Sequence, residues 1–159
     1  MAFAVRLLTT ENKLVALILD VPGWMLNFYD STDWNLLEQI PLPTDTDIPR
    51  MKLRWLTITD AGEIFITAYA SIWLLDRTKN EWNLIHQDKR KRVWFSHLTQ
   101  LPLKGATHFL VCLQGEVLQE IPLSEGQGLK TICANILSRN QVRELGAYAV
   151  DKDGNLVVT

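Results

Sequence analysis

The sequence predicts a mainly β fold of antiparallel strands, in which one structural unit is repeated along the chain. Four short apolar segments recur at a nearly constant interval. Their central residues, Leu14, Ile64, Phe109 and Leu156, lie 50, 45 and 47 residues apart, and a period of this length is typical of repeat architectures. Between them, runs rich in Val, Ile, Trp, Tyr and Phe are split by turn-forming residues about every 10 positions, as in antiparallel all-β domains.

The composition is that of one globular domain spanning residues 1–159, with 47% hydrophobic and 21% charged residues. A net charge of −2 at pH 7 argues against a nucleic-acid or anionic-membrane surface over the whole molecule. The longest apolar run, Leu14–Leu19, is far too short to span a membrane. Residues 1–6 lack a signal-peptide pattern, and the two cysteines, Cys112 and Cys133, fit a reducing compartment. The sequence therefore predicts a cytoplasmic protein without membrane contact.

The first unit is expected over residues 3–42, as four strands separated by polar turns: Phe3–Leu8, Lys13–Leu19, Trp24–Tyr29 and Trp34–Leu42. The segment Pro43–Pro49, with two prolines and two aspartates, excludes a central strand and marks a linker.

The second unit is expected over residues 52–87, again as four strands: Leu53–Thr59, Glu63–Tyr69, Ser71–Leu75 and Trp82–His86. Its last strand matches that of the first unit, because Trp34-Asn35-Leu36 and Trp82-Asn83-Leu84 have the same pattern 48 residues apart. This match predicts that Trp34 and Trp82 are equivalent and that both are largely buried.

The third unit, over residues 93–123, is less regular, and one of its strands is missing or fused. A change of pattern follows over residues 128–146. Leu129, Ile132 and Ile136 have helical spacing, and Ser138–Gln141 has the pattern of a capping box, so a helical pair is expected there. The β pattern resumes over residues 147–159 as two further strands.

Four-stranded antiparallel units of 40–50 residues, with an Asp turn (Asp30, Asp76) and a Trp near the last strand (Trp34, Trp82), resemble β-propeller blades. The resemblance implies about three and a half blade-like units, a number that does not close a ring. The chain has no WD dipeptide at the unit ends and no kelch double glycine. The alternative is an α+β domain with a curved antiparallel sheet packed on the helices of residues 128–146.

One segment concentrates charge and aromatic side chains. Four cations are followed by two aromatic residues in the order Lys89, Arg90, Lys91, Arg92, Val93, Trp94, Phe95. Such a segment can grip phosphates and stack on a base, or bind an acidic protein. It can equally be a solvated loop beside a sheet edge.

Catalytic, metal and cofactor sites are not predicted. His86, His97 and His108 lie eleven residues apart, which is not a zinc-ligand spacing. Cys112 lies four residues from His108 in one expected strand, which separates them by about 13 Å. No glycine-rich phosphate loop is present in the sequence.

The sequence thus favours a non-enzymatic protein-interaction, assembly or scaffold module that binds a protein partner or itself. The alternative is a regulatory domain that binds nucleic acid or another anionic ligand through Lys89–Phe95. The apolar segment Asn155–Thr159 would leave a free strand edge. We therefore expect it to be covered by Phe3–Leu8 or by a second molecule.

Overall fold

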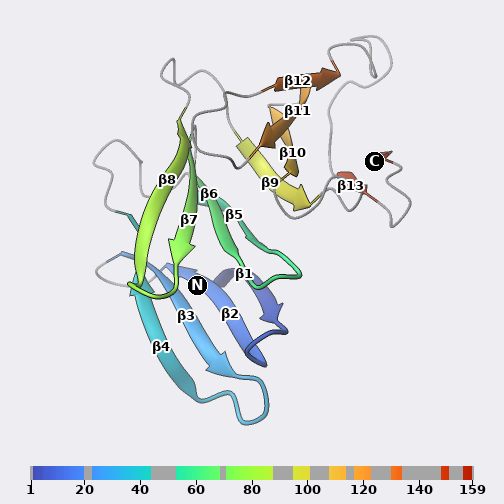
Figure 1. Cartoon of the computed structure of the whole chain (residues 1–159). Coiled ribbons are helices and arrows are strands. Elements are labelled where there is room, and N and C mark those ends of the chain that lie inside the picture. Colours follow the sequence, from blue (N-terminus) through green and yellow to red (C-terminus); the bar gives the residue numbers. More distant parts are fainter. Residues whose placement is uncertain are drawn as a thin grey trace.

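The computed structural model describes the chain in ten segments, and the structural statements below concern these residues: 2–19, 23–43, 53–68, 71–87, 95–100, 108–113, 117–122, 130–133, 148–150 and 156–158. Throughout these segments the regular structure is β-strand (Figure 1). The mainly β, antiparallel fold class is confirmed.

The first unit is a four-stranded antiparallel meander in the order β1-β2-β3-β4. Its strands are β1 (Ala2–Leu8), β2 (Lys13–Leu19), β3 (Trp24–Asp30) and β4 (Leu36–Pro41). The second unit has the same topology, in the order β5-β6-β7-β8. Its strands are β5 (Leu53–Ile58), β6 (Ile64–Ala68), β7 (Ser71–Asp76) and β8 (Glu81–Gln87).

The third unit is also a four-stranded antiparallel sheet, in the order β9-β10-β11-β12. It contains β9 (Phe95–Gln100), β10 (His108–Leu113), β11 (Val117–Pro122) and β12 (Lys130–Cys133). A hairpin of β13 (Tyr148–Val150) and β14 (Leu156–Val158) follows. These four-stranded sheets fit blade-like units. The four evenly spaced anchors, Leu14, Ile64, Phe109 and Leu156, each lie in the second strand of their group.

The expectation of helix over residues 128–146 is wrong for Lys130–Cys133, which form β12. This strand pairs with β11 through Leu118 opposite Cys133 and Glu120 opposite Lys130. A short apolar run has no decisive period, and the β-branched Thr131 and Ile132 favour a strand when a sheet edge is available. β12 is therefore the fourth strand that the third unit lacked in the sequence pattern. The helices of the α+β alternative are not found in the described segments, and residues 134–146 lie outside them.

The first strands of successive units lie next to one another: β1 contacts β5, β5 contacts β9, and β9 contacts β13. The expected cover of the last strand by the first is not found, because the described pairing joins β14 to β13 and β1 to β2.

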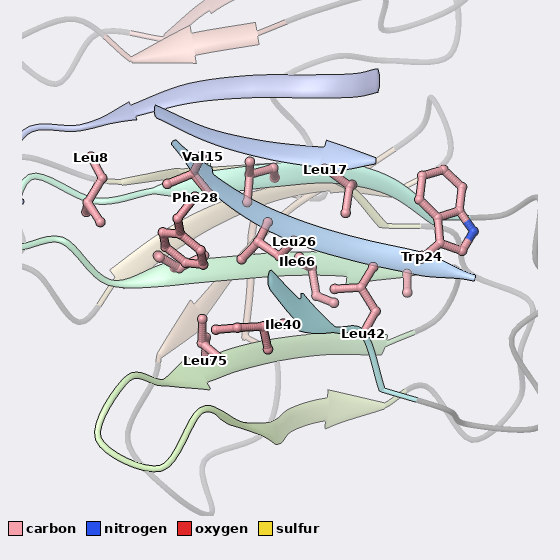
Figure 2. Packing of buried hydrophobic residues seen from close by; sticks show 13 residues of the cluster. Leu8, Val15, Leu17, Trp24, Leu26, Phe28, Ile40, Leu42, Ile66 and Leu75 are labelled. Carbon is pink, nitrogen blue, oxygen red and sulfur yellow. The ribbon is translucent and has the colours of Figure 1, made fainter. Parts of the chain in front are cut away.

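The hydrophobic core lies between the first two sheets (Figure 2). We call the side of each sheet that points toward the following unit its forward face, and the opposite side its rear face. The first unit fills the core from its forward face with Leu8, Val15, Leu17, Trp24, Leu26, Phe28 and Ile40. The second unit fills it from its rear face with Leu56, Ile64, Ile66, Ala68 and Leu75. Each fully buried Leu, Ile or Phe contributes about 1.5–3 kcal/mol to this packing.

The forward face of the second unit points toward the third unit. Phe65, Thr67 and Ile72 on this face are buried. Thr57, which is opposite Phe65 in register, donates its hydroxyl hydrogen to the backbone oxygen of Leu98 in β9 at 3.1 Å. The second sheet is therefore covered on both faces.

Candidate interaction surface

Two equivalent turns close the last hairpins of the first and second units. In the first, Oδ1 of Asp30 accepts a hydrogen bond from the backbone N–H of Thr32 at 2.7 Å. In the second, Oδ1 of Asp76 accepts from the backbone N–H and the hydroxyl of Thr78 at 2.9 and 2.6 Å. These bonds lower the pKa of both carboxyl groups, chiefly through the Thr32 backbone N–H for Asp30 and the Thr78 hydroxyl for Asp76.

The predicted equivalence of Trp34 and Trp82 is wrong. Trp34 lies in the turn with φ of 64°, and the residue with the same role in the second turn is Asn80, with φ of 54°. Trp82 instead corresponds to Leu36, because each pairs with the residue just before its turn aspartate: Leu36 with Tyr29, and Trp82 with Leu75. Trp34 is 68% exposed. Trp82 packs against the core and donates its indole N–H to the Pro41 oxygen at 2.9 Å.

Arg77 links the second unit to the first. Its guanidinium donates to a Glu38 carboxylate oxygen at 3.0 Å and to a Glu11 carboxylate oxygen at 3.3 Å. It also lies 4.2 Å from the ring centre of Phe28. Glu11 is bound in addition by Lys13 at 2.7 Å. That Lys13 hydrogen bond is the main cause of the lowered pKa of Glu11; burial opposes it and Arg77 adds to it.

A shallow depression of about 350 Å³ lies beside this link, and its lining includes Gly62, Glu63, Leu75, Asp76, Arg77 and Asn83. Its charged groups are engaged within the protein: Glu63 accepts from the Thr59 hydroxyl at 3.2 Å, and Asp76 and Arg77 have the partners described above. Of these contacts, those of Arg77 join the two units, and those of Glu63 and Asp76 lie within the second unit. Within the described segments, no three His, Cys, Asp or Glu side chains form a group that could hold a metal ion.

The rear face of the first unit has a different character. Strand register places only apolar and uncharged polar side chains on it: Val5, Leu7, Leu14, Ala16, Ile18, Met25, Asn27, Tyr29, Leu36, Gln39 and Pro41. Three of its hydrophobic residues are about half exposed: Val5 at 47%, Leu7 at 50% and Leu36 at 48%. It is an extended apolar surface without a charge.

A short polar ladder crosses the middle of this face. The side-chain amide of Asn27 donates to the Tyr29 hydroxyl at 3.0 Å, and the amide of Gln39 donates to the Asn27 oxygen at 3.3 Å. Asn27 is buried, and both of its polar groups are paired within the sheet. A molecule that covered this face would therefore leave the hydrogen bonds of the Asn27 side chain intact.

The equivalent face of the second unit is largely buried, with Leu84 in its last strand 44% exposed. The anchors Leu14 and Ile64 occupy matching positions, and Ile64, Ile66 and Leu75 on the rear face of the second unit are packed against the first unit. The same position in the repeat is therefore a packing surface in one unit and an open surface in the other.

The predicted binding segment and this surface are separate parts of the chain. Lys89, Arg90, Lys91, Arg92 and Trp94 lie outside the described residues, and Phe95 is the first residue of β9, opposite Leu113. The rear face was not among the binding sites predicted from the sequence. A signal for it exists in Leu14-Val15-Ala16-Leu17-Ile18, which is apolar on both sides of the strand and so requires cover on both.

No protein-family model matches the chain, and none of the curated proteins matches it. Solved structures do resemble it. The chain is similar to the extracellular domain of the putative one-component system BT4673 from B. thetaiotaomicron, with a TM-score of 0.65 and 14% identity over 99% of this chain and 19% of that chain. It is also similar to the dihydro-heme d1 dehydrogenase NirN in complex with DHE, with a TM-score of 0.60 and 16% identity over 98% of this chain and 32% of that chain.

At these identities the likeness concerns the fold alone. The chain spans about a fifth of the length of the BT4673 domain and about a third of that of NirN. In the described segments, no helix has the length and apolar character needed to cross a membrane.

Proposed function

We propose that the chain is a non-enzymatic protein-interaction or assembly module, and that the rear face of the first unit is its docking surface. One observation carries the proposal: this face is apolar, uncharged and about half exposed at Val5, Leu7 and Leu36, whereas its equivalent in the second unit is buried against a neighbouring sheet. Extended apolar patches on soluble proteins typically mark sites where another molecule binds.

We also propose that the units are blades of a propeller-like array. The contacts of β1 with β5, of β5 with β9 and of β9 with β13 support this arrangement, because the innermost strands of propeller blades lie close together around a central channel. In such an array each sheet is covered by a neighbour on both faces. An open rear face is then a place where one more sheet fits.

Two expectations from the sequence stay predictions. Binding of an anionic ligand through Lys89–Phe95 concerns residues that are mostly outside the described segments. The cytoplasmic location has no structural support, and one similar structure is described as an extracellular domain.

The docking surface can be tested by site-specific photo-crosslinking in cells that express the full chain. A benzophenone amino acid replaces Leu7 on the rear face or, as a matched control, Leu84, which is 44% exposed in the last strand of the second unit. We expect a protein adduct from position 7 that is absent from position 84. That adduct should be lost when Leu36→Glu places a charge on the same face.

Mass spectrometry of the adducts identifies the bound protein. If positions 7 and 84 gave the same adducts, or if neither gave any, the rear face would not be a docking surface.

A further inference from the structure

We infer that the rear face of the first unit binds the same face of a second copy of this chain, across a two-fold axis. This inference rests on the proposed function, because it takes the rear face to be a docking surface and names its partner. Three features identify the partner: the rear face carries no charge, the other faces of the first two sheets are already packed, and the area of the rear face suits a weak dimer.

The absence of charge on the rear face permits it to pack against itself. A charged side chain on this face would be buried twice in a dimer, once from each copy, and burying an unpaired charge costs several kcal/mol. The charged side chains of the first sheet belong to its other side: Arg6 is opposite Val15, and Glu38 is opposite Phe28, both forward-face positions. Two rear faces can therefore approach without repulsion between like charges and without a buried, unpaired ion.

In the first two units of a second copy, the other sheet faces are already packed against a neighbouring sheet. The forward face of the first unit, with Leu26 and Phe28 fully buried, packs against the second unit. The rear face of the second unit is the other side of that interface. Its forward face, with Phe65 and Ile72 fully buried, points toward the third unit. Among the sheet faces of the first two units, the rear face of the first unit is the one left open, and pairing of this face with its own copy gives a closed two-fold dimer.

The dimensions of the face indicate a weak dimer. Four strands about 4.8 Å apart, with about six residues each rising 3.3 Å, make a surface of roughly 19 by 20 Å. This flat area of about 400 Å² per copy is around half of the 800 Å² that a standard stable interface buries on each partner. We therefore expect dissociation in the micromolar range, with the two sheets packed about 10 Å apart.

Sedimentation velocity of the full chain, from about 1 µM to about 500 µM, tests the inference across the range expected for such a dimer. The wild-type chain should pass from monomer to dimer as its concentration rises. Leu7→Glu should weaken association at least about tenfold, because each copy then buries a charge in the interface. The matched control, Leu84→Glu, places the same charge at a similarly exposed leucine in the second unit and should leave dimerisation unchanged.

The circular dichroism spectrum separates a lost interface from a lost fold. Leu7→Glu and Leu7→Lys should each be monomeric with the spectrum of the wild type, because a charge of either sign on the rear face would be buried in the dimer. A charged variant at position 7 that keeps the wild-type spectrum and still dimerises like the wild type overturns the inference.

A wild-type chain that stays monomeric at the highest concentration overturns the inference. If position 7 still crosslinks to a different protein in cells, the proposed docking surface remains and only its partner is wrong. If position 7 also gives no specific adduct, the proposed function falls as well. A dimer that Leu84→Glu abolishes and Leu7→Glu does not would place the contact on the second unit and overturn the inference.

Discussion

The first and second units have the same four-stranded topology but differ in how completely they are buried. In the second unit, all five residues of β6, Ile64–Ala68, are buried. In the first unit, the matching strand β2 is buried at Val15, Ala16 and Leu17 but partly exposed at Leu14 and Ile18. The strand that is partly open is as apolar as the one that is closed.

This difference shows that the burial of a strand's side chains depends on whether another sheet packs on that face. A strand that is apolar on both sides is suited to a sheet covered on both faces. The second unit has a neighbour on each face, and the first unit has one neighbour within the described residues. The forward faces should therefore behave alike in stability measurements, while the rear faces should not.

The largest expected effect tests the forward faces. Phe28 and Phe65 are both fully buried, the first between the first two units and the second on the side of the third. Phe28→Ala and Phe65→Ala should each lower the free energy of unfolding by about 3–5 kcal/mol, because each removes a large packed side chain and leaves a cavity. Urea denaturation followed by circular dichroism measures both. A loss below about 1 kcal/mol for Phe65→Ala would mean that the third unit does not cover the second.

The two tryptophans near the last strands give the next largest contrast. Trp82→Ala should cost about 2–4 kcal/mol, because Trp82 packs on the core and donates a hydrogen bond to the Pro41 oxygen. Trp34→Ala should cost less than about 0.5 kcal/mol, because its side chain is mostly in solvent. Urea denaturation of both variants, with Trp82→Phe to isolate the hydrogen bond, is the measurement. Equal losses at the two positions would restore the equivalence that the sequence suggested.

The first hairpin turns of the two units sharpen the comparison further. Gly62 has φ of 84°, and a Cβ placed there would lie 2.5 Å from the Thr10 hydroxyl oxygen in the equivalent turn of the first unit. Gly62→Ala should therefore cost about 1–2 kcal/mol from backbone strain and this close contact. Thermal denaturation of Gly62→Ala, alone and combined with Thr10→Ala, separates the two causes.

In the double variant, the loss due to the close contact should be relieved while the loss due to the positive φ remains. If Thr10→Ala relieved nothing, the two turns would not touch in solution.

Much of the fold could be predicted from the sequence because it depends on local patterns. Leu14, Ile64, Phe109 and Leu156 all fall in second strands, since a repeated hairpin repeats its apolar centre. The segment around Ile132 was mistaken for helix because four to eight apolar residues have no decisive period, and β11 supplies the edge that makes it a strand.

The candidate surface could not be predicted in the same way. The match of Trp34 with Trp82 rested on identical residue types and was wrong. The turn geometry gives the true alignment, because the residue four positions after each turn aspartate adopts positive φ, and these residues are Trp34 and Asn80. The rear face was missed because the exposure of Leu7 and Leu36 depends on which sheets lie beside them. That is a property of the assembled units and not of any one strand.

The smallest expected effect concerns pH. The pKa of Glu11 is lowered mainly by its hydrogen bond from Lys13 and further by Arg77 of the second unit. A carboxyl group whose pKa is lower in the folded than in the unfolded protein contributes stability that is fully present above its unfolded pKa, about 4.3 for Glu, and lost as pH falls through its folded pKa. We therefore expect the urea midpoint to be flat between about pH 5 and 7 and to fall below about pH 4.

Three variants test the origin of this fall. Asp30→Asn and Asp76→Asn should each make the fall with pH less steep, to a similar extent, because equivalent turns lower both pKa values. Glu11→Gln should flatten it as well, chiefly through the loss of the Lys13 hydrogen bond and further through the loss of the Arg77 contact. An acid-side slope that Glu11→Gln leaves unchanged would mean that Lys13 and Arg77 do not hold this carboxylate in solution.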